Sequence, residues 1–166
     1  MHTPVYGTET AMRALEAAKA DCVISFGGGS TTGLGKAIAL RTGVPQITIP
    51  TTYAGSEVTP IRGQTENGRK TTIRDMKIPP DVVIYDPELT LGLPVPMTVA
   101  GALNAMAHSM EGLYARDCNP ISTMTAIESF RSFRASLPGL MKEPHDLDLR
   151  AEAQYACWLD EDRPDL

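Results

Sequence analysis

Three consecutive glycines followed by a serine, Gly27-Gly28-Gly29-Ser30, form the segment of this sequence best suited to hold a phosphate group. This glycine turn follows the apolar residues 22–26 and precedes a helical pattern, so several backbone N–H groups would converge at the positive end of a helix dipole. Glycines let a diphosphate approach the main chain because they carry no side chain. The glycines also suit a tight strand-to-helix turn without a ligand, since their spacing resembles GxGxxG only loosely and lacks the Walker pattern.

A second polar segment, the threonine loop (residues 51–59, TTYAGSEVT), follows the next apolar segment. The carboxyl ends of neighbouring parallel strands open onto one crevice, so we expect Thr51, Thr52 and Ser56 to lie beside the glycine turn. Their hydroxyls could hydrogen-bond the ribose and carboxamide of a dinucleotide, or could equally cap the loop itself. Lys70 could bring a cation to a cofactor ribose or an acidic substrate, although a lysine in this setting is more often solvated.

The elements that must position these residues follow from hydrophobic patterning. Short apolar runs predict buried parallel strands over residues 22–26, 46–50 and 81–86. Helical spacing predicts helices over residues 8–19, 34–42, 97–116, 120–137 and 146–159. Hydroxyls of Ser30, Thr31 and Thr32 are expected to cap the second helix, and residues 51–80 should be loops or irregular strands. On the first long helix, core contacts are expected from Met97, Leu103, Met106, Met110 and Leu113.

A helix between two apolar strands makes a βαβ crossover and a parallel sheet the expected arrangement. The sequence therefore predicts an α/β fold, with a sheet-containing front half and an all-helical rear half. Its 166 residues carry a formal net charge of −5, which gives no basic field for nucleic acid. Three widely spaced cysteines, no export signal and no long apolar run favour a soluble, cytoplasmic protein that does not bind membranes.

Four segments resemble, in this order, the iron-containing alcohol dehydrogenase superfamily, and within it the maleylacetate reductases: GGGSTTGLGKAIAL, IPTTYAGSEVTPI, DVVIYDPELTLGLP and AGALNAMAHSMEGLYA. The resemblance implies a dehydroquinate synthase-like fold, with an incomplete parallel-sheet dinucleotide-binding domain over residues 1–94 and the start of an all-helical domain over residues 95–166. It implies NADH or NADPH as cofactor. The implied cofactor-binding residues are Gly28, Gly29 and Ser30 at the diphosphate, Thr51, Thr52 and Ser56 near the nicotinamide ribose, and the basic residue Lys70.

By the same resemblance, Asn104 and His108 occupy positions where metal-binding members carry an aspartate and a histidine. Four residues apart on a helix, the two side chains share a face, and Glu111 follows one turn later. An amide oxygen is a poorer ligand for a transition metal than a carboxylate, so no bound iron or zinc is expected. His108 would donate a hydrogen bond or relay a proton to the substrate; otherwise it is a buried helix histidine bonded to a carbonyl.

The resemblance implies hydride transfer from NAD(P)H to the small dicarboxylate 2-maleylacetate, giving 3-oxoadipate in the degradation of aromatic compounds, by a protein that could form a homodimer. Two alternatives stay open: a metal-dependent alcohol dehydrogenase of the same superfamily, and a truncated, inactive chain with at most weak nucleotide binding. The second arises because family members have further strands before residue 1 and further helices after residue 159. We therefore expect an unpaired sheet edge and exposed apolar helix faces.

Overall fold

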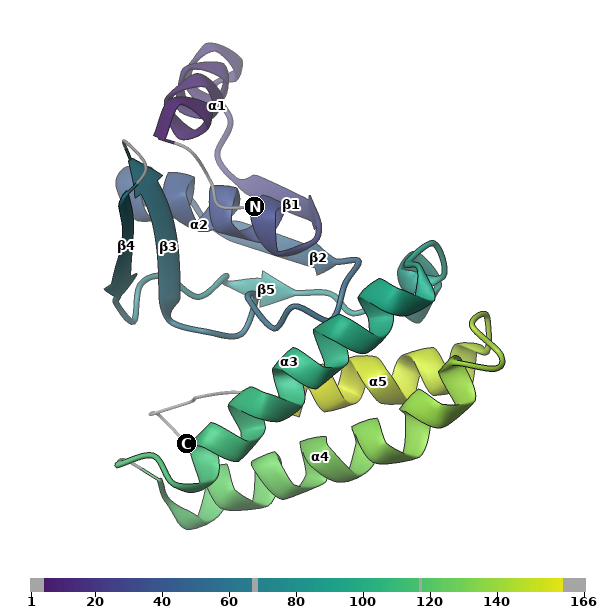
Figure 1. The fold of residues 1–166 in the computed structure, drawn as a ribbon. Helices are drawn as coiled ribbons and strands as arrows, with labels where there is room; N and C mark the ends of the chain where they lie inside the picture. The colour runs from purple at the N-terminus through teal and green to yellow at the C-terminus, as the bar shows by residue number, and fades with distance from the viewer. Residues whose placement is uncertain (1–4, 67–68, 117, 160–166) are drawn as a thin grey trace.

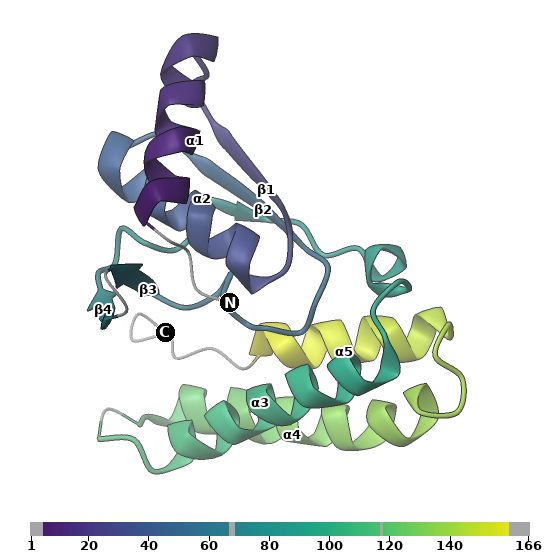
Figure 2. The ribbon, with the colours of Figure 1, turned by 45° about the horizontal axis from the view of Figure 1, so that its top comes forward.

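The computed structural model describes residues 5–66, 69–116 and 118–159, and the sequence folds into two layers (Figure 1). The front half contains α1 (Val5–Ala18), β1 (Val23–Gly27), α2 (Gly29–Thr42), β2 (Gln46–Pro50), β3 (Ile61–Glu66), β4 (Arg69–Arg74), β5 (Val82–Val83) and the 3-10 turn η1 (Pro87–Thr90). The rear half contains α3 (Val95–Leu113), α4 (Pro120–Leu140) and α5 (Leu147–Leu159). The predicted α/β class is confirmed, and Figure 2 shows the three rear helices as a layer of their own.

The parallel sheet has the strand order β1-β2-β5 and positions the glycine turn. Its register runs from Val23 opposite Gln46 to Gly27 opposite Pro50, so β1 and β2 end side by side. The N–H of Thr51 then donates to the carbonyl of Gly27 over 3.1 Å. Consequently the glycine turn and the threonine loop leave the sheet at the same edge, as a parallel βαβ unit requires.

Helix α2 packs on this sheet through a polar contact at Gly35. A Cβ atom at Gly35 would overlap both Ser25 Oγ and Gln46 Nε2, so only glycine fits there. The Gln46 side chain is buried, and its Nε2 donates to Ser25 Oγ at 3.0 Å and to Thr48 Oγ1 at 3.1 Å. These hydrogen bonds satisfy hydroxyls that would otherwise be buried without partners.

Three regions differ from the sequence prediction. Helix α2 begins at Gly29 rather than at residue 34, because the Gly28 carbonyl accepts the N–H groups of Thr31 and Thr32 at 3.0 and 3.1 Å. The predicted strand over residues 81–86 contains only β5, since Pro87 begins η1 shortly after it. Within the expected loop region, β3 and β4 form an antiparallel hairpin.

Helix α3 packs on the other rear helices through small residues rather than through the long apolar side chains that the pattern predicted. Helix α3 buries Ala102, Ala105 and Ser109, and the Ser109 hydroxyl donates to Ser129 Oγ on α4 at 3.0 Å. The expected stripe on α3 is largely wrong, because four of its members are exposed: Met97, Leu103, Met110 and Leu113. Only Met106 packs against the core. Small residues let the helix axes approach closely, and this leaves the methionines outside.

Candidate functional site

The threonine loop lies directly against the glycine turn. A Cβ atom at Gly28 would come within 2.9 Å of Thr52 Cγ2, and one at Gly29 within 3.3 Å of Ala54 Cβ. Gly27 has a φ of +147°, a conformation that side-chain-bearing residues rarely adopt. The predicted proximity of the two segments is therefore confirmed, and glycine is needed for both its backbone angles and its small size.

The polar groups at this edge remain within reach of a ligand. Ser30 is exposed in the first turn of α2, whereas Thr51, Thr52 and Ser56 are half-buried in the loop opposite it. Gly28 is the N-cap of α2, so the first-turn N–H groups point toward the same edge. The helix dipole adds partial positive charge at that point. This arrangement can hold an anionic group between the backbone of α2 and the hydroxyls of the loop.

Lys36 lies behind this edge, on the second turn of α2, and is fully buried at 0% exposure. Its Nζ donates to the carbonyl of Ser56, to Thr59 O at 2.7 Å and to Ile61 O at 3.1 Å. Burial lowers the pKa of Lys36 to about 8, while the charge of Glu57 acts in the opposite direction. The lysine thus joins α2 to the far end of the threonine loop.

Glu57 is the buried carboxyl group of the same loop, with 2% exposure. Its Oε1 accepts a hydrogen bond from the Tyr85 hydroxyl at 3.2 Å. Burial raises the pKa of Glu57, and the bonds from its own backbone and from Tyr85, together with the charge of Lys36, offset part of that effect. A buried acid and a buried base therefore lie close enough on the inner side of the loop for each charge to shift the pKa of the other group.

Lys70 is placed only by its backbone, which pairs with Thr65 in the β3–β4 hairpin. Its side chain lies outside the described residues, so its predicted contact with a cofactor stays a prediction.

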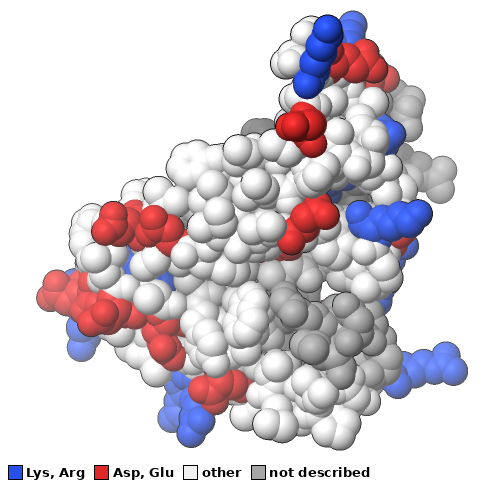
Figure 3. Space-filling model, turned by 180° about the vertical axis from the view of Figure 1, so that it is seen from behind, with Lys and Arg blue, Asp and Glu red and all other residues white. Residues whose placement is uncertain are grey.

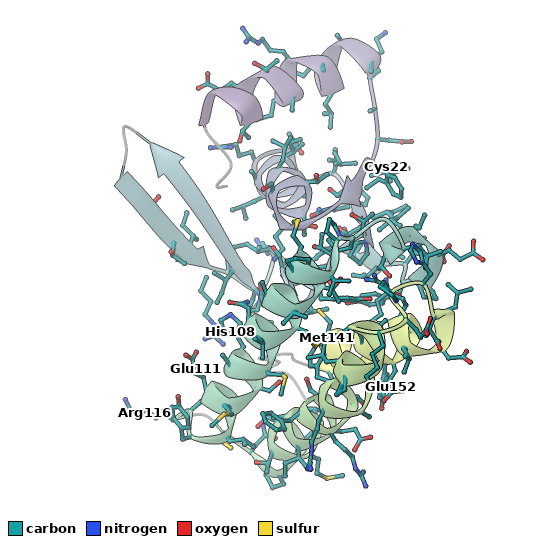
Figure 4. All side chains as sticks on the ribbon, turned by 45° about the vertical axis from the view of Figure 1, so that its right-hand side comes forward. Cys22, His108, Glu111, Arg116, Met141 and Glu152 are labelled. Carbon is teal, nitrogen blue, oxygen red and sulfur yellow. The ribbon has the colours of Figure 1, made fainter. Side chains whose placement is uncertain are left out.

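Asn104 and His108 lie on the exposed side of α3. His108 has a side-chain exposure of 59%, and its Nδ1 lies 3.6 Å from Oε2 of Glu111. Figure 4 shows His108 and Glu111 on the side of α3 that faces away from α4 and α5. The alternative of a buried helix histidine is therefore wrong. The described residues contain no group of three His, Cys, Asp or Glu side chains that could hold a metal ion.

Helix α3 passes beneath the threonine loop, as the ribbon shows (Figure 2). A Cβ atom at Gly101 would lie 3.2 Å from the carbonyl oxygen of Tyr53. Asn104 follows this contact by about one turn of α3, and His108 follows by about two. The exposed polar face of α3 therefore starts where the loop crosses the helix.

A buried arginine fixes this crossing. Arg150 on α5 has 0% exposure, and its Nη1 donates to Thr98 Oγ1 at 3.1 Å and to the Tyr53 hydroxyl at 3.4 Å. Its Nη2 donates to Leu93 O at 3.2 Å and its Nε to Pro144 O at 2.8 Å. The threonine loop is thereby tied to the helical half through Tyr53.

The sequence reasoning missed both buried cations. A signal for Lys36 was available, because it is the only charged residue between Gly27 and Leu40 in an otherwise small and apolar helix. Arg150 shares a helical face with Ala153 and Cys157, and the spacing i, i+3, i+7 places it in the core. A charge on a buried face needs hydrogen-bonding partners, and here these partners connect separate elements.

The surface charge agrees with the composition. Figure 3 shows one face of the molecule, with acidic side chains gathered at the edge formed by η1 and the α4–α5 turn and with basic side chains scattered. Among the residues that the structure describes, none of the helices has both the length and the apolar character that crossing a bilayer requires.

Comparisons with known proteins match both halves of the chain. A family model described as iron-containing alcohol dehydrogenase matches residues 1–87, and one described as Fe-containing alcohol dehydrogenase family, C-terminal, matches residues 98–160. The maleylacetate reductase of Rhizobium sp. (strain MTP-10005) is 64% identical over 159 residues, which are 96% of this chain and 45% of the relative. The chain thus spans about half the length of such curated relatives.

Solved structures show the same similarity in three dimensions. The crystal structure of maleylacetate reductase from Agrobacterium tumefaciens superposes with a TM-score of 0.95 at 63% identity, covering 96% of this chain and 46% of that one. Sulfoacetaldehyde reductase from Bifidobacterium kashiwanohense, solved in complex with NAD+, superposes with a TM-score of 0.88 at 27% identity, covering 95% of this chain and 48% of that one.

Proposed function

Because the chain belongs to the iron-containing alcohol dehydrogenase family, we propose that it binds NADH or NADPH at the glycine turn and acts as a maleylacetate reductase. The observation that carries the proposal is the close contact between Gly28 and Thr52, which brings the backbone of the glycine turn against the threonine loop at the start of α2. The similarity to maleylacetate reductases supports the reaction, and the NAD+ complex of a more distant neighbour supports the cofactor.

The residues of this edge fit a dinucleotide diphosphate. Gly28, Gly29 and Ser30 would bind it through backbone N–H groups, and any side chain on the two glycines would meet Thr52 or Ala54. Thr51, Thr52 and Ser56 would hydrogen-bond the nicotinamide ribose. When bound, the reduced nicotinamide supplies the hydride. Lys70 would contact the cofactor from the hairpin.

The proposed reaction adds a hydride and a proton across the carbon–carbon double bond of 2-maleylacetate, which gives 3-oxoadipate. His108 and Asn104 would face the substrate from α3, where both are exposed. The imidazole of His108 would donate a hydrogen bond to a carboxylate or to the carbonyl oxygen as enolate charge develops, and the amide of Asn104 would orient the same dicarboxylate.

We further propose that the reaction needs no bound metal. The face of α3 that carries Asn104 and His108 offers one imidazole and one neutral amide, and Glu111 already lies 3.6 Å from the imidazole. This donor set does not fit an iron site, because a neutral amide oxygen attracts a divalent cation less than a carboxylate does. The same feature disfavours a metal-dependent alcohol dehydrogenase.

Four further expectations complete the proposal. The division into domains at residues 94 and 95 is supported by the beginning of α3 at Val95 and by the gap between the two matched family models. Free cysteines favour the reducing cytoplasm, and they are Cys22, Cys118 and Cys157. The substrate would be a small dicarboxylate, with neither nucleic acid nor membrane as partner. Exposed methionines on α3 and α4 would support a homodimer.

Titration of the chain with NADH, followed by nicotinamide fluorescence, tests the cofactor site, and maleylacetate-dependent oxidation of NADH tests the reaction. We expect saturable binding that excess NAD+ displaces. Absence of saturable binding in the folded chain would overturn the cofactor proposal. Binding without turnover would overturn the proposed reaction of this chain alone.

A further inference from the structure

The carbonyl groups around Lys36 belong to a single stretch of chain, which contains the end of the threonine loop and the first residue of β3. The ammonium group donates to Ser56, Thr59 and Ile61, and it also lies 3.3 Å from Thr59 Oγ1. Three carbonyl oxygens and one hydroxyl thus surround a cation that has no contact with water. Because a buried ammonium must find acceptors, this part of the loop is held in the position that supplies them.

The same loop segment forms one wall of the proposed cofactor site. A Cβ atom at Gly29 would lie 3.8 Å from Ser56 Cβ, so Ser56 faces the glycine turn while its carbonyl accepts from Lys36. Lys36 and Gly29 belong to the same helix and are separated by about two turns. The lysine therefore links the helix that presents the backbone N–H groups to the loop that presents the hydroxyls.

We propose that Lys36 is a positioning residue of the dinucleotide site: its buried ammonium holds the carbonyls of Ser56, Thr59 and Ile61 and thereby fixes the threonine loop against the glycine turn. This inference rests on the proposed function. Lys36 would touch neither cofactor nor substrate, since its Nζ is enclosed by the loop. Its role is to keep the binding-competent arrangement of the loop populated before the cofactor arrives.

A purely structural role for Lys36 makes a different prediction. If the lysine only stabilised the fold, removing it would lower stability and cofactor affinity together. Burial lowers the pKa of Lys36 to about 8, so the ammonium group is less stable here than in water, although it stays charged at neutral pH. Removing the ammonium leaves the loop carbonyls without their donor, but a released loop can turn these carbonyls to water, so we expect stability to fall less than affinity.

Lys36→Met tests this separation, because methionine keeps an unbranched chain and removes the charge. Lys142→Met is the control, since Lys142 is exposed. We expect Lys36→Met to raise the Kd for NADH on the order of tenfold, as when the competent loop is populated about one-tenth of the time. The urea midpoint should fall by less than the loss of affinity would imply, and Lys142→Met should change neither quantity. An unchanged Kd, or a Kd that weakens only in proportion to a lower midpoint, would overturn the proposal.

Amide hydrogen exchange gives a readout that does not depend on NADH. In Lys36→Met, protection should fall in residues 51–61 and persist in α4 and α5. If the wild-type chain binds no NADH, the proposed function fails, and exchange alone then decides the role of Lys36. Loss confined to residues 51–61 supports the positioning role; retained protection, or uniform loss along the chain, overturns it.

A second variant applies if Lys36→Met does not fold. Thr59→Val keeps the lysine and removes the hydroxyl acceptor near its Nζ. We expect a rise in the Kd for NADH of about threefold, the size of one weak hydrogen bond, and a matching loss of protection in residues 51–61. No change in either measurement would overturn the proposal.

Discussion

Thr52 lies so close to Gly28 that a Cβ atom on the glycine would come 2.9 Å from the threonine Cγ2 and 3.1 Å from its Oγ1. Real Cβ atoms do not approach other heavy atoms this closely, so even a methyl group would displace one of the two segments. Two segments more than twenty positions apart in sequence thus depend on each other for their placement. The glycine turn and the threonine loop act as one structural unit at the sheet edge.

Gly28→Ala should therefore damage both stability and cofactor binding. Gly28 has a φ of −86°, which alanine tolerates, so the effect is purely steric. Overpacking of this kind costs about 1–3 kcal/mol of unfolding free energy, and displacement of Thr52 should weaken NADH binding. Urea unfolding and NADH titration measure the two effects. Gly92→Ala is the control, because nothing lies within 4 Å of a Cβ atom there. Equal behaviour of the two variants would contradict the argument.

Asn104→Asp should create a metal site where the wild-type chain has none of comparable affinity. The substitution adds a carboxylate on the helical face of His108, one turn away, and a carboxylate with an imidazole suits Zn²⁺ far better than an amide does. We expect at least about a tenfold gain in Zn²⁺ affinity, given the added charge. Calorimetric titration with zinc chloride measures it, and Asn104→Ser is the control. Stoichiometric, equally tight binding by the wild-type chain would refute the metal-free proposal.

Glu57 should make stability depend on pH in a defined direction. Burial raises the pKa of Glu57 above its ordinary value of 4.5, so the folded chain holds this proton to higher pH than the unfolded chain. Between the two pKa values the folded state binds more protons, and the free energy of unfolding falls as pH rises. Each unit of difference corresponds to about 1.4 kcal/mol.

Glu57→Gln removes the titrating group and keeps an acceptor for the Tyr85 hydroxyl. The contribution of Glu57 to the pH slope should vanish in this variant and persist in Glu88→Gln, a control at an exposed position. Urea unfolding from about pH 4 to about pH 7 spans the onset of this window. Parallel curves for the wild type and Glu57→Gln would show that the carboxyl group titrates normally.

Arg150→Met should destabilise the chain far more than a surface substitution of the same kind. Its acceptors include the carbonyl of Leu93 before α3, the carbonyl of Pro144 in the turn before α5, and the buried hydroxyls of Thr98 and Tyr53. Each buried acceptor left unpaired costs about 1–3 kcal/mol, so a loss of about 3 kcal/mol or more is expected.

Arg131→Met is the matched control for Arg150→Met. Arg131 is 76% exposed and pairs with Glu128 on the same helix at 2.9 Å. Such surface pairs contribute about 1 kcal/mol or less. Chemical denaturation of the two variants compares them directly, and similar losses would mean that the Arg150 hydrogen bonds add little to the junction.

The order of elements could be predicted because it depends on local patterns. The bounds of β2 were predicted correctly, since three β-branched residues lie between Gln46 and Pro50 and the polar loop follows. The parallel arrangement then placed the glycine turn beside Thr52. The start of α2 could not be predicted from the sequence, because glycines have weak helix propensity. The first turn of the helix is formed by hydrogen bonds to the Gly28 carbonyl, which the sequence pattern does not indicate.

Other features depend on partners that are distant in the chain. The stripe from Met97 to Leu113 matched a buried helix face by period, yet α3 buries Ala102, Ala105 and Ser109 because α4 and α5 approach it closely. The β3–β4 hairpin has no alternating pattern to reveal it. Lys36 and Arg150 can be buried because folding brings backbone carbonyls from distant positions around them. A pattern read residue by residue does not show which carbonyls will come together.

The contact between α2 and the sheet includes a directed bond, from Gln46 Nε2 on β2 to the carbonyl of Thr32 on α2 at 3.4 Å. Apolar surfaces can shift against each other at little energetic cost, but this bond requires a fixed direction, and Gly35 leaves no room for a larger residue. The helix is consequently held in one position relative to the strands. The first turn of α2, and any anion bound there, therefore keeps a fixed position relative to the sheet, because the helix does not slide along it.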